Sequence, residues 1–139
     1  MINTKNHSKY PERIVCLTEE SVEFLYDLGL QDRIAGISAF VERPEKARKN
    51  HPVVTTFTHS NTSKIEALNP DLIVGFSDIQ KDIARDLIGK GYNVFISNQR
   101  SLSEILKYLH TLGGMLGEVE KTEKYVSQLK AKIESFKNK

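Results

Sequence analysis

The sequence has little of what several classes of protein require. Its 139 residues include one cysteine, Cys16, which excludes an internal disulfide framework and a zinc site built from cysteines. The 20 lysine and arginine residues are nearly balanced by 18 aspartate and glutamate residues, so the net charge of +2 provides no basic field for nucleic acid. Nucleic acid is therefore not an expected partner.

The amino-terminal segment also lacks an apolar run before Ile14, so neither a secretory signal nor a membrane span is visible. The chain as written is therefore expected to be cytoplasmic, or periplasmic or extracellular if a leader was removed. Residues 1–10 are mostly polar and are expected to form a disordered tail.

The short motifs of common catalytic sites are missing as well. The sequence contains no glycine-rich phosphate loop after a strand, no G-x-S-x-G elbow and no H-E-x-x-H pair. Cys16 lies within a predicted buried strand, where a thiol is usually inert. We therefore expect a protein that is not an enzyme and has no intrinsic cofactor.

What the sequence does contain is an alternation of short apolar runs with segments of helical period. The runs, rich in valine and isoleucine, lie at 14–17, 34–37, 72–75 and 93–96. This alternation is typical of βαβ units. It predicts an α/β, Rossmann-like lobe over residues 11–117, with a parallel sheet of about four strands and helices on both faces.

Capping and turn residues predict the helices between these runs. A helix over 21–29 is expected to end at Gly29, and Asp78 can cap a helix that ends near Gly89. A shorter helix is expected to open at Asn61 or Ser63, run through Ile65 and Leu68 and stop at the Asn69-Pro70 pair.

The last third of the sequence has a different character. Ser101 or Ser103 can cap a helix that breaks near Gly113-Gly114 or Gly117, and a long helix of about 30 Å is expected over 118–139. One apolar stripe follows that helix: Val119, Val126, Leu129, Ile133 and Phe136. The stripe either packs on its own lobe or pairs with another chain.

Several segments taken together resemble a known family. They are PERIVCLTEESVEFLYDLGLQDRIAGIS, VVTTFTHSN, IEALNPDLIVGF and GYNVFISNQRSLSEI. They are similar to the amino-terminal lobe of substrate-binding proteins of ABC importers for iron–siderophore complexes, haem and cobalamin. In that family two α/β lobes, joined by one long helix, hold the ligand in a cleft. The resemblance covers about Pro11 to Lys139, one lobe plus the connecting helix.

The resemblance implies non-catalytic binding of a metal chelate, namely a corrinoid, haem or ferric siderophore. Open α/β sheets bind ligands beyond the carboxyl ends of their strands, which indicates the same place. The residues expected to contact the ligand are Thr18, Glu19, Phe40, Phe57, His59, Asn61, Phe76, Asn98 and Arg100.

Each of these residues also has an ordinary structural interpretation. Phe57 and Phe76 either stack on a flat chelate or are rim or core residues. His59 either ligates a metal or lies on the surface, and without a second ligand at suitable spacing no metal site is assigned. Arg100 either meets an anionic chelate or is solvated. For Glu19 and the neighbouring Glu20 we favour helix capping over ligand contact.

Partners follow from the same resemblance. Family members usually present a glutamate in an N-L-E pattern to arginines of the permease, and Ser63 in N-T-S stands in its place. Its absence weakens the prediction of permease docking without excluding it, because an exposed ion pair contributes only about 0–1 kcal/mol. The alternative function is a degenerate half-receptor, a protein-interaction scaffold or homodimer that uses the 119–136 stripe without binding a small molecule.

Overall fold

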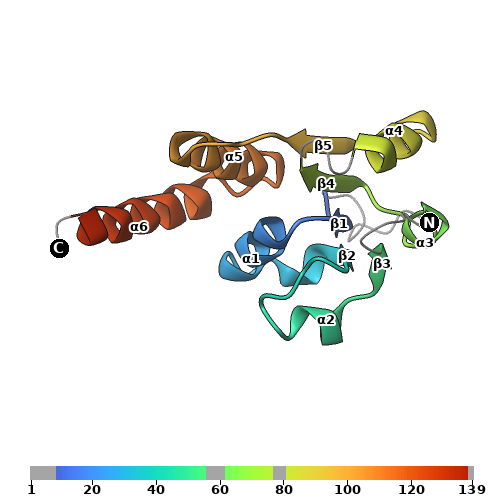
Figure 1. The fold of residues 1–139 in the computed structure, drawn as a ribbon, viewed down its shortest axis with the longest axis horizontal. Helices are drawn as coiled ribbons and strands as arrows, with labels where there is room; N and C mark the ends of the chain where they lie inside the picture. Colours follow the sequence, from blue (N-terminus) through green and yellow to red (C-terminus); the bar gives the residue numbers. More distant parts are fainter. Residues whose placement is uncertain (1–8, 56–61, 77–80, 138–139) are drawn as a thin grey trace. The chain divides into compact units, whose positions relative to one another are not determined.

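The computed structural model describes residues 9–55, 62–76 and 81–137. The chain forms two compact units, Met1–Asn98 and Gln99–Lys139. The first contains a parallel sheet with its helices, and the second contains two helices (Figure 1). The predicted division between residues 117 and 118, which separates a lobe from a connecting helix, stays a prediction.

The sheet has five parallel strands in the order β3-β2-β1-β4-β5 (Figure 1). They are β1 Ile14–Cys16, β2 Ile34–Ser38, β3 Val53–Thr55, β4 Leu72–Phe76 and β5 Val94–Ser97. The predicted α/β fold is confirmed, and each of the four predicted runs is a strand. The fifth strand, β3, was missed because only two of its residues, Val53 and Val54, are apolar, which is too short a run to indicate a buried strand.

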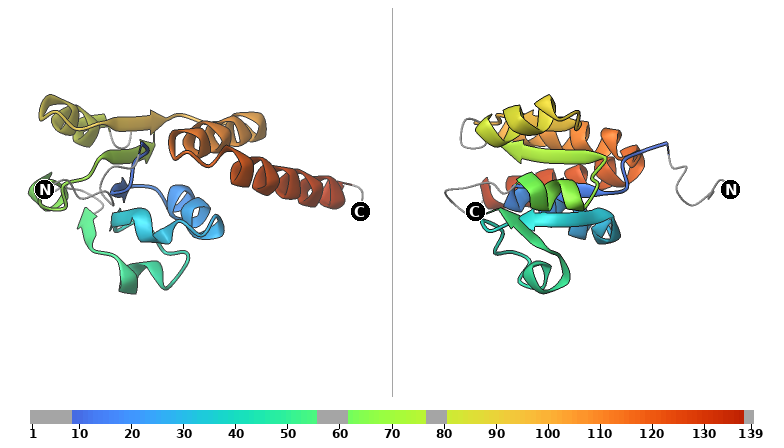
Figure 2. Two further views of the ribbon diagram at one scale, coloured as in Figure 1. Left: turned by 180° about the vertical axis from the view of Figure 1, so that it is seen from behind. Right: turned by 90° about the vertical axis from the view of Figure 1, so that its right-hand side faces the viewer.

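Alternate residues of the central strands pack on opposite faces of the sheet, as strand geometry requires. Val15 and Ile73 belong to a buried cluster with Ile65 of α3, Thr62–Ala67, and Leu87 of α4, Lys81–Gly89. On the other face α1, Glu19–Asp27, contacts β1 and β2. Figures 1 and 2 show α1 on the opposite side of the sheet from α3 and α4. The prediction of helices on both faces is confirmed.

The ends of α1 follow local chemistry. The Thr18 side chain accepts a hydrogen bond from the backbone N–H of Ser21, so the helix begins at Glu19, two residues before the predicted start. Beyond its end, Gly29 has a φ of +74°, a left-handed conformation that favours glycine, as predicted. A short 3₁₀ turn, η2 Gln31–Arg33, then leads into β2, and α2 Ala47–Asn50 precedes β3.

The side of the sheet where the strands begin, here called its amino edge, is held together by Asp71, which precedes β4. Its Oδ2 accepts the backbone N–H of Glu12 and its Oδ1 accepts that of Arg13, both at 2.8 Å. The Arg13 guanidinium in turn donates to the Leu68 carbonyl, 2.9 Å from Nε. These contacts join the starts of two neighbouring strands, β1 and β4.

The second unit is a pair of packed helices, α5 Leu102–Met115 and α6 Val119–Lys137. Ser101 caps α5 by accepting the N–H of Glu104, which selects the first of its two predicted caps. The helices approach closely, because a Cβ placed on Gly113 would lie 1.8 Å from Thr122 Oγ1. Among the described helices, none is long and apolar enough to cross a membrane.

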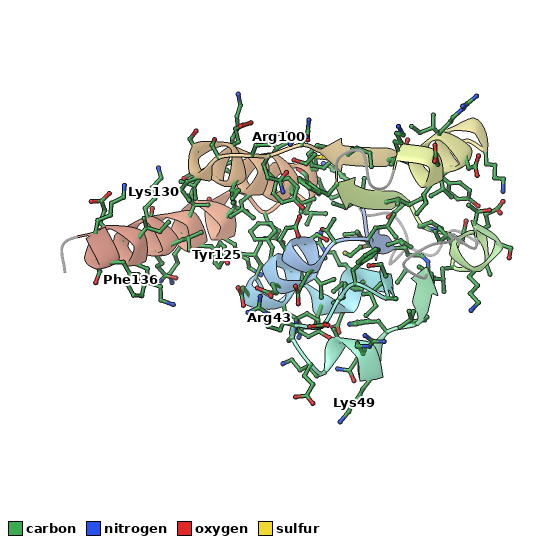
Figure 3. The ribbon with its side chains drawn as sticks, in the orientation of Figure 1. Arg43, Lys49, Arg100, Tyr125, Lys130 and Phe136 are labelled. Atoms are coloured by element: carbon green, nitrogen blue, oxygen red, sulfur yellow. The ribbon has the colours of Figure 1, made fainter. Side chains whose placement is uncertain are left out.

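The apolar stripe of α6 is unevenly buried. Val126 is 2% exposed and Leu129 and Ile133 are half-buried, whereas Val119 is 55% and Phe136 70% exposed. Figure 3 shows Phe136 near the end of the helix. The predicted long helix is confirmed, and its two terminal apolar residues face solvent more than the middle of the stripe does.

Candidate functional site

The strand order brings together residues that are far apart in the sequence. The carboxyl ends of β2, β1, β4 and β5 lie side by side, since these strands are parallel neighbours. The register pairs Cys16 with Val74 and Phe76 with Ser97, which sets the ends of three strands nearly level. Four of the predicted site residues therefore follow or end adjacent strands: Phe40, Thr18, Phe76 and Asn98.

The order in which strands are added to the sheet changes side between β1 and β4. From β1 the chain proceeds to β2 and β3 on one side, then crosses to β4 and β5 on the other. Ligands of open α/β sheets bind at such a switch point, outside the carboxyl ends of the strands. Thr18 and Phe76 lie on the two sides of this point.

Thr18 is 6% exposed and its hydroxyl is engaged within the protein. The hydroxyl donates to Ser21 Oγ at 2.7 Å and accepts the Ser21 N–H at 3.3 Å. These bonds satisfy the first turn of α1. Contact of Thr18 with a ligand stays a prediction, and the described role of its hydroxyl is the helix cap.

Two half-buried aromatic residues, Phe40 and Phe76, provide apolar surface at the strand ends. Phe76 is the last residue of β4. The Phe40 backbone N–H donates to Ser38 Oγ at 3.3 Å, and the same Ser38 hydroxyl donates to the Leu17 carbonyl at 3.0 Å. Ser38, which is fully buried, thus ties the start of the loop after β2 to the end of β1.

Glu19 is engaged with the same loop. Its Oε1 accepts the backbone N–H of Arg43 at 2.7 Å and that of Glu42 at 3.2 Å. The Arg43 Nε lies 3.5 Å from both Glu19 Oε1 and Glu23 Oε1. The sequence favours capping of its own helix by Glu19; the carboxylate instead satisfies donors of a loop 23 and 24 residues further along the chain.

The other predicted site residues are placed differently. Phe57, His59 and Asn61 lie outside the described residues, as does Asp78, the predicted cap of α4. Asn98, the last residue of the first unit, is exposed. Arg100 is exposed in the second unit (Figure 3), so the structure does not join it to the row of strand ends.

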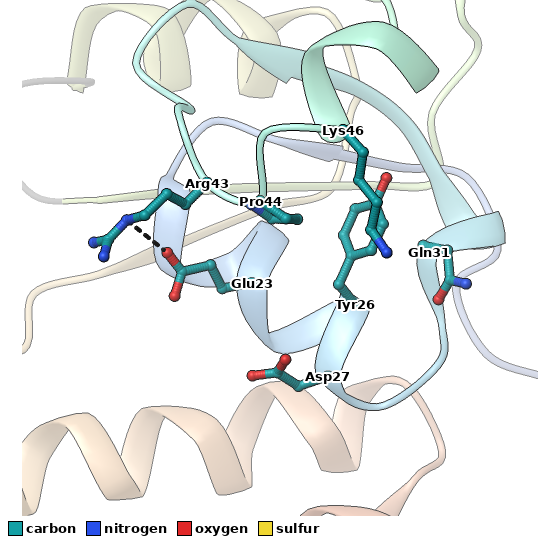
Figure 4. A pocket seen from close by; sticks show the side chains of 7 residues that line it. All are labelled: Glu23, Tyr26, Asp27, Gln31, Arg43, Pro44 and Lys46. Carbon is teal, nitrogen blue, oxygen red and sulfur yellow. Dashed lines mark ion pairs between the residues drawn. The ribbon is translucent and has the colours of Figure 1, made fainter.

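A pocket of about 450 Å³ runs along α1, away from the strand ends (Figure 4). It is lined by Glu23, Tyr26, Asp27, Gln31, Arg43, Pro44 and Lys46. Sequence reasoning assigned none of these residues to a site, because the pocket depends on packing of the loop after β2 against a helix.

The charges of this pocket largely satisfy one another. Figure 4 shows Glu23 facing Arg43 and Lys46 beside Tyr26; the Lys46 Nζ lies 5.1 Å from the centre of that ring. Burial raises the pKa of Glu23, and Arg43 opposes this rise. The pocket is thus a mixed-charge surface to which Tyr26 and Pro44 contribute apolar area, unlike the predominantly apolar lining of most small-molecule sites.

Among the described residues, no group of three or more histidine, cysteine, aspartate or glutamate side chains is arranged to hold a metal ion. Burial raises the pKa of Cys16 to about 12, with a smaller opposing effect from Ser21. The thiol is therefore protonated at neutral pH and a poor nucleophile.

Residues 14–139 match the family model described as periplasmic binding protein. The ABC transporter substrate-binding lipoprotein YvrC of Bacillus subtilis is 26% identical over 135 residues, which cover 94% of this chain and 42% of that protein. A vitamin B12-binding protein of Yersinia pestis is 26% identical over 129 residues, 92% of this chain and 46% of that protein.

The fold is also similar to that of solved structures. A crystal structure of a possible iron-binding, periplasmic solute-binding protein from Staphylococcus epidermidis superposes with a TM-score of 0.85 at 22% identity. The match covers 94% of this chain and 52% of that one. The chain thus spans about half the length of the relatives it matches.

Proposed function

The chain belongs to the periplasmic binding protein family, and from this membership we propose that it is a non-catalytic binding protein for a small metal chelate. The chemical class is a corrinoid, a haem or a ferric siderophore. The observation that carries the proposal is the row of strand ends at the switch point, where Phe40 and Phe76 supply apolar surface. Aromatic rings suit a flat ligand because they offer large contact area with few rotamers to fix.

The relatives support this proposal through their names, which include a vitamin B12-binding protein and a possible iron-binding protein. We further propose an extracytoplasmic location, since YvrC is a lipoprotein and the family is named for the periplasm. The described lobe offers one side of a cleft, whereas good pockets enclose most of a ligand. By itself it is expected to bind with about micromolar or weaker affinity.

The test is size-exclusion chromatography with light scattering and absorbance detection, run with cobalamin, haemin and a ferric siderophore in turn. A coloured chelate that co-elutes with the protein supports the proposal. Because a complex of micromolar or weaker affinity can dissociate on the column, a negative result is decided by equilibrium absorbance titration at about 100 μM protein, where no spectral change with any of the three contradicts the proposal. Replacing Phe40 and Phe76 together by alanine is expected to weaken binding about tenfold or more. Tyr10→Ala, which removes a 47% exposed aromatic side chain near the amino edge, is the matched control.

A second candidate function is a scaffold that pairs with a second copy through α6. The half-buried Leu129 and Ile133 favour it, since they continue an apolar stripe beyond the buried Val126. A stripe on one helix can meet its own copy around a two-fold axis. A dimer that is lost in Leu129→Glu with Ile133→Glu, and kept in the exposed control Ser127→Glu with Ala131→Glu, would support this function.

Docking on an ABC permease belongs to the first proposal and is independent of the second. Ser63, which stands where the resemblance expects a glutamate, is exposed on α3. Its replacement by glutamate is expected to strengthen docking on a cognate permease only slightly, since an exposed ion pair contributes about 0–1 kcal/mol.

A further inference from the structure

The loop after β2 is anchored to the rest of the lobe at both of its ends. At its start the Ser38 hydroxyl bonds to the Leu17 carbonyl, and the Val41 N–H donates to the Ser38 carbonyl at 3.2 Å. Val41 itself is 0% exposed. At the other end Glu19 accepts two consecutive backbone N–H groups, those of Glu42 and Arg43.

Phe40 lies between these anchors. Its own N–H is bonded to Ser38 Oγ, and two and three residues later the backbone N–H groups of Glu42 and Arg43 bond to the Glu19 carboxylate. The loop has no strand or helix of its own over residues 39–43. Its conformation therefore depends on burial of Val41 and on bonds to side chains. The Glu19 bonds are charge-assisted and shorter than the bond from Arg48 Nη1, which lies 3.4 Å from the Ala39 carbonyl.

We propose that Glu19 is a positioning residue of the candidate site. Its carboxylate fastens the loop 39–43 to the first turn of α1, so that Phe40 is held at the strand ends before a ligand arrives. This inference rests on the proposed function. The role we assign to Glu19 is exerted through the loop, since its Oε1 accepts the N–H groups of Glu42 and Arg43.

The physical gain is preorganisation. A loop that is already ordered loses less conformational freedom when a ligand binds, so the same contacts give a higher affinity. Glu19 is suited to this task because its side chain is only 29% exposed, which limits competition from water. The Arg43 guanidinium, shared between Glu19 and Glu23, keeps both carboxylates near the loop.

Two variants and one control test the inference. Glu19→Ala removes the acceptor, and Glu19→Gln keeps a carbonyl oxygen at the same distance along the side chain but removes the charge. Glu20→Ala makes the same change in charge on the same turn of α1, at an exposed position. Thermal melts establish first that all three variants fold.

The first measurement is amide hydrogen exchange at Glu42 and Arg43 in the ligand-free protein, followed by NMR. Exchange at these two amides is expected to rise about tenfold or more in Glu19→Ala, since a bond to a charged acceptor is lost. Glu19→Gln is expected to retain part of the protection, and Glu20→Ala all of it. The second measurement is the affinity for whichever of cobalamin, haemin or ferric siderophore binds the wild-type protein.

Affinity is expected to fall at least about threefold in Glu19→Ala and to recover in Glu19→Gln, without change in Glu20→Ala. If a chelate binds but exchange at the two amides is unchanged in Glu19→Ala, the positioning role is wrong and the proposed function stands. The positioning role is also wrong if exchange accelerates while the affinity of Glu19→Ala stays equal to that of Glu20→Ala. Absence of binding to the wild-type protein would overturn the proposed function and the positioning role together.

Discussion

Two carboxylates perform the same hydrogen-bonding task at opposite edges of the sheet. At the amino edge Asp71 accepts the N–H groups of Glu12 and Arg13, one on each of its oxygens. At the carboxyl edge Glu19 accepts those of Glu42 and Arg43, both on the same oxygen. Each carboxylate thus satisfies two consecutive backbone donors of a distant segment.

The difference lies in what each carboxylate holds. Asp71 joins the starts of two hydrogen-bonded strands, β1 and β4. The Arg13 side chain adds a second link, because it donates to the Leu68 carbonyl. Glu19 joins a helix to a loop without regular structure. We therefore predict that the same hydrogen bonds contribute mainly stability where they link strands, and mainly conformational order where they link a loop.

The largest effect is expected for Asp71→Ala, which should lower the free energy of unfolding by about 2 kcal/mol through loss of two charge-assisted hydrogen bonds. Urea unfolding followed by circular dichroism measures this change. Asp86→Ala, at an exposed position of α4, is the matched control. A loss no greater than that of Asp86→Ala would contradict the stabilising role of the amino edge.

Glu19→Ala is expected to cost less, about 1 kcal/mol or below, because the loop it releases can rearrange and hydrate its N–H groups. The same urea experiment gives this value. In the double variant with Asp71→Ala, the two losses in the free energy of unfolding should add to within about 0.5 kcal/mol, since the two sites share no partner. Equal losses of unfolding free energy in the two single variants would contradict the predicted difference between the two edges.

A smaller, pH-dependent effect is expected at the amino edge, where His51 precedes β3. Burial lowers the pKa of His51 below its ordinary value, with opposing contributions from the Ile34 backbone and Asp32, and its Nε2 lies 2.7 Å from the Tyr26 hydroxyl. The unfolded chain therefore binds a proton more readily than the folded one. The resulting stability is complete above the unfolded pKa near 6.5 and is lost as the pH falls toward the lower, folded pKa.

Urea unfolding at about pH 7.5 and about pH 5.5 measures this dependence. His51→Gln, which keeps a polar side chain but cannot titrate, should lose less stability between the two conditions than the wild-type protein. An identical loss in both proteins would assign the pH dependence to other groups.

The smallest effect concerns Cys16, the last residue of the central strand β1. With its pKa raised to about 12 and no exposed surface, the thiol is expected to resist iodoacetamide at neutral pH in the wild-type protein and in Glu19→Ala. Mass spectrometry measures the labelling, with urea-unfolded protein as the positive control. Rapid labelling of Glu19→Ala would show that the carboxyl edge also supports the central strand.

Local features of the sequence were sufficient for much of the fold. The apolar runs identified four of the five strands, because buried strands of a parallel sheet are continuously hydrophobic. Gly29 marked the left-handed turn after α1, whose last residue is Asp27, and Ser101 is one of the two predicted caps of α5, since capping depends on residues within one turn. The predicted start of α1 lies two residues after the observed one, because Thr18, and not a residue nearer the apolar positions, supplies the cap.

Residues close together in the chain were sufficient to predict four of the five strands, most helix ends and the family resemblance. The position of β1 between β2 and β4 follows from packing of the whole lobe, and it brings Phe40, Thr18 and Phe76 to neighbouring strand ends. The tertiary structure also decided the partner of Glu19. A carboxylate at the start of a helix can cap that helix or reach another segment, and the path of the chain between α1 and the loop after β2 selects the second.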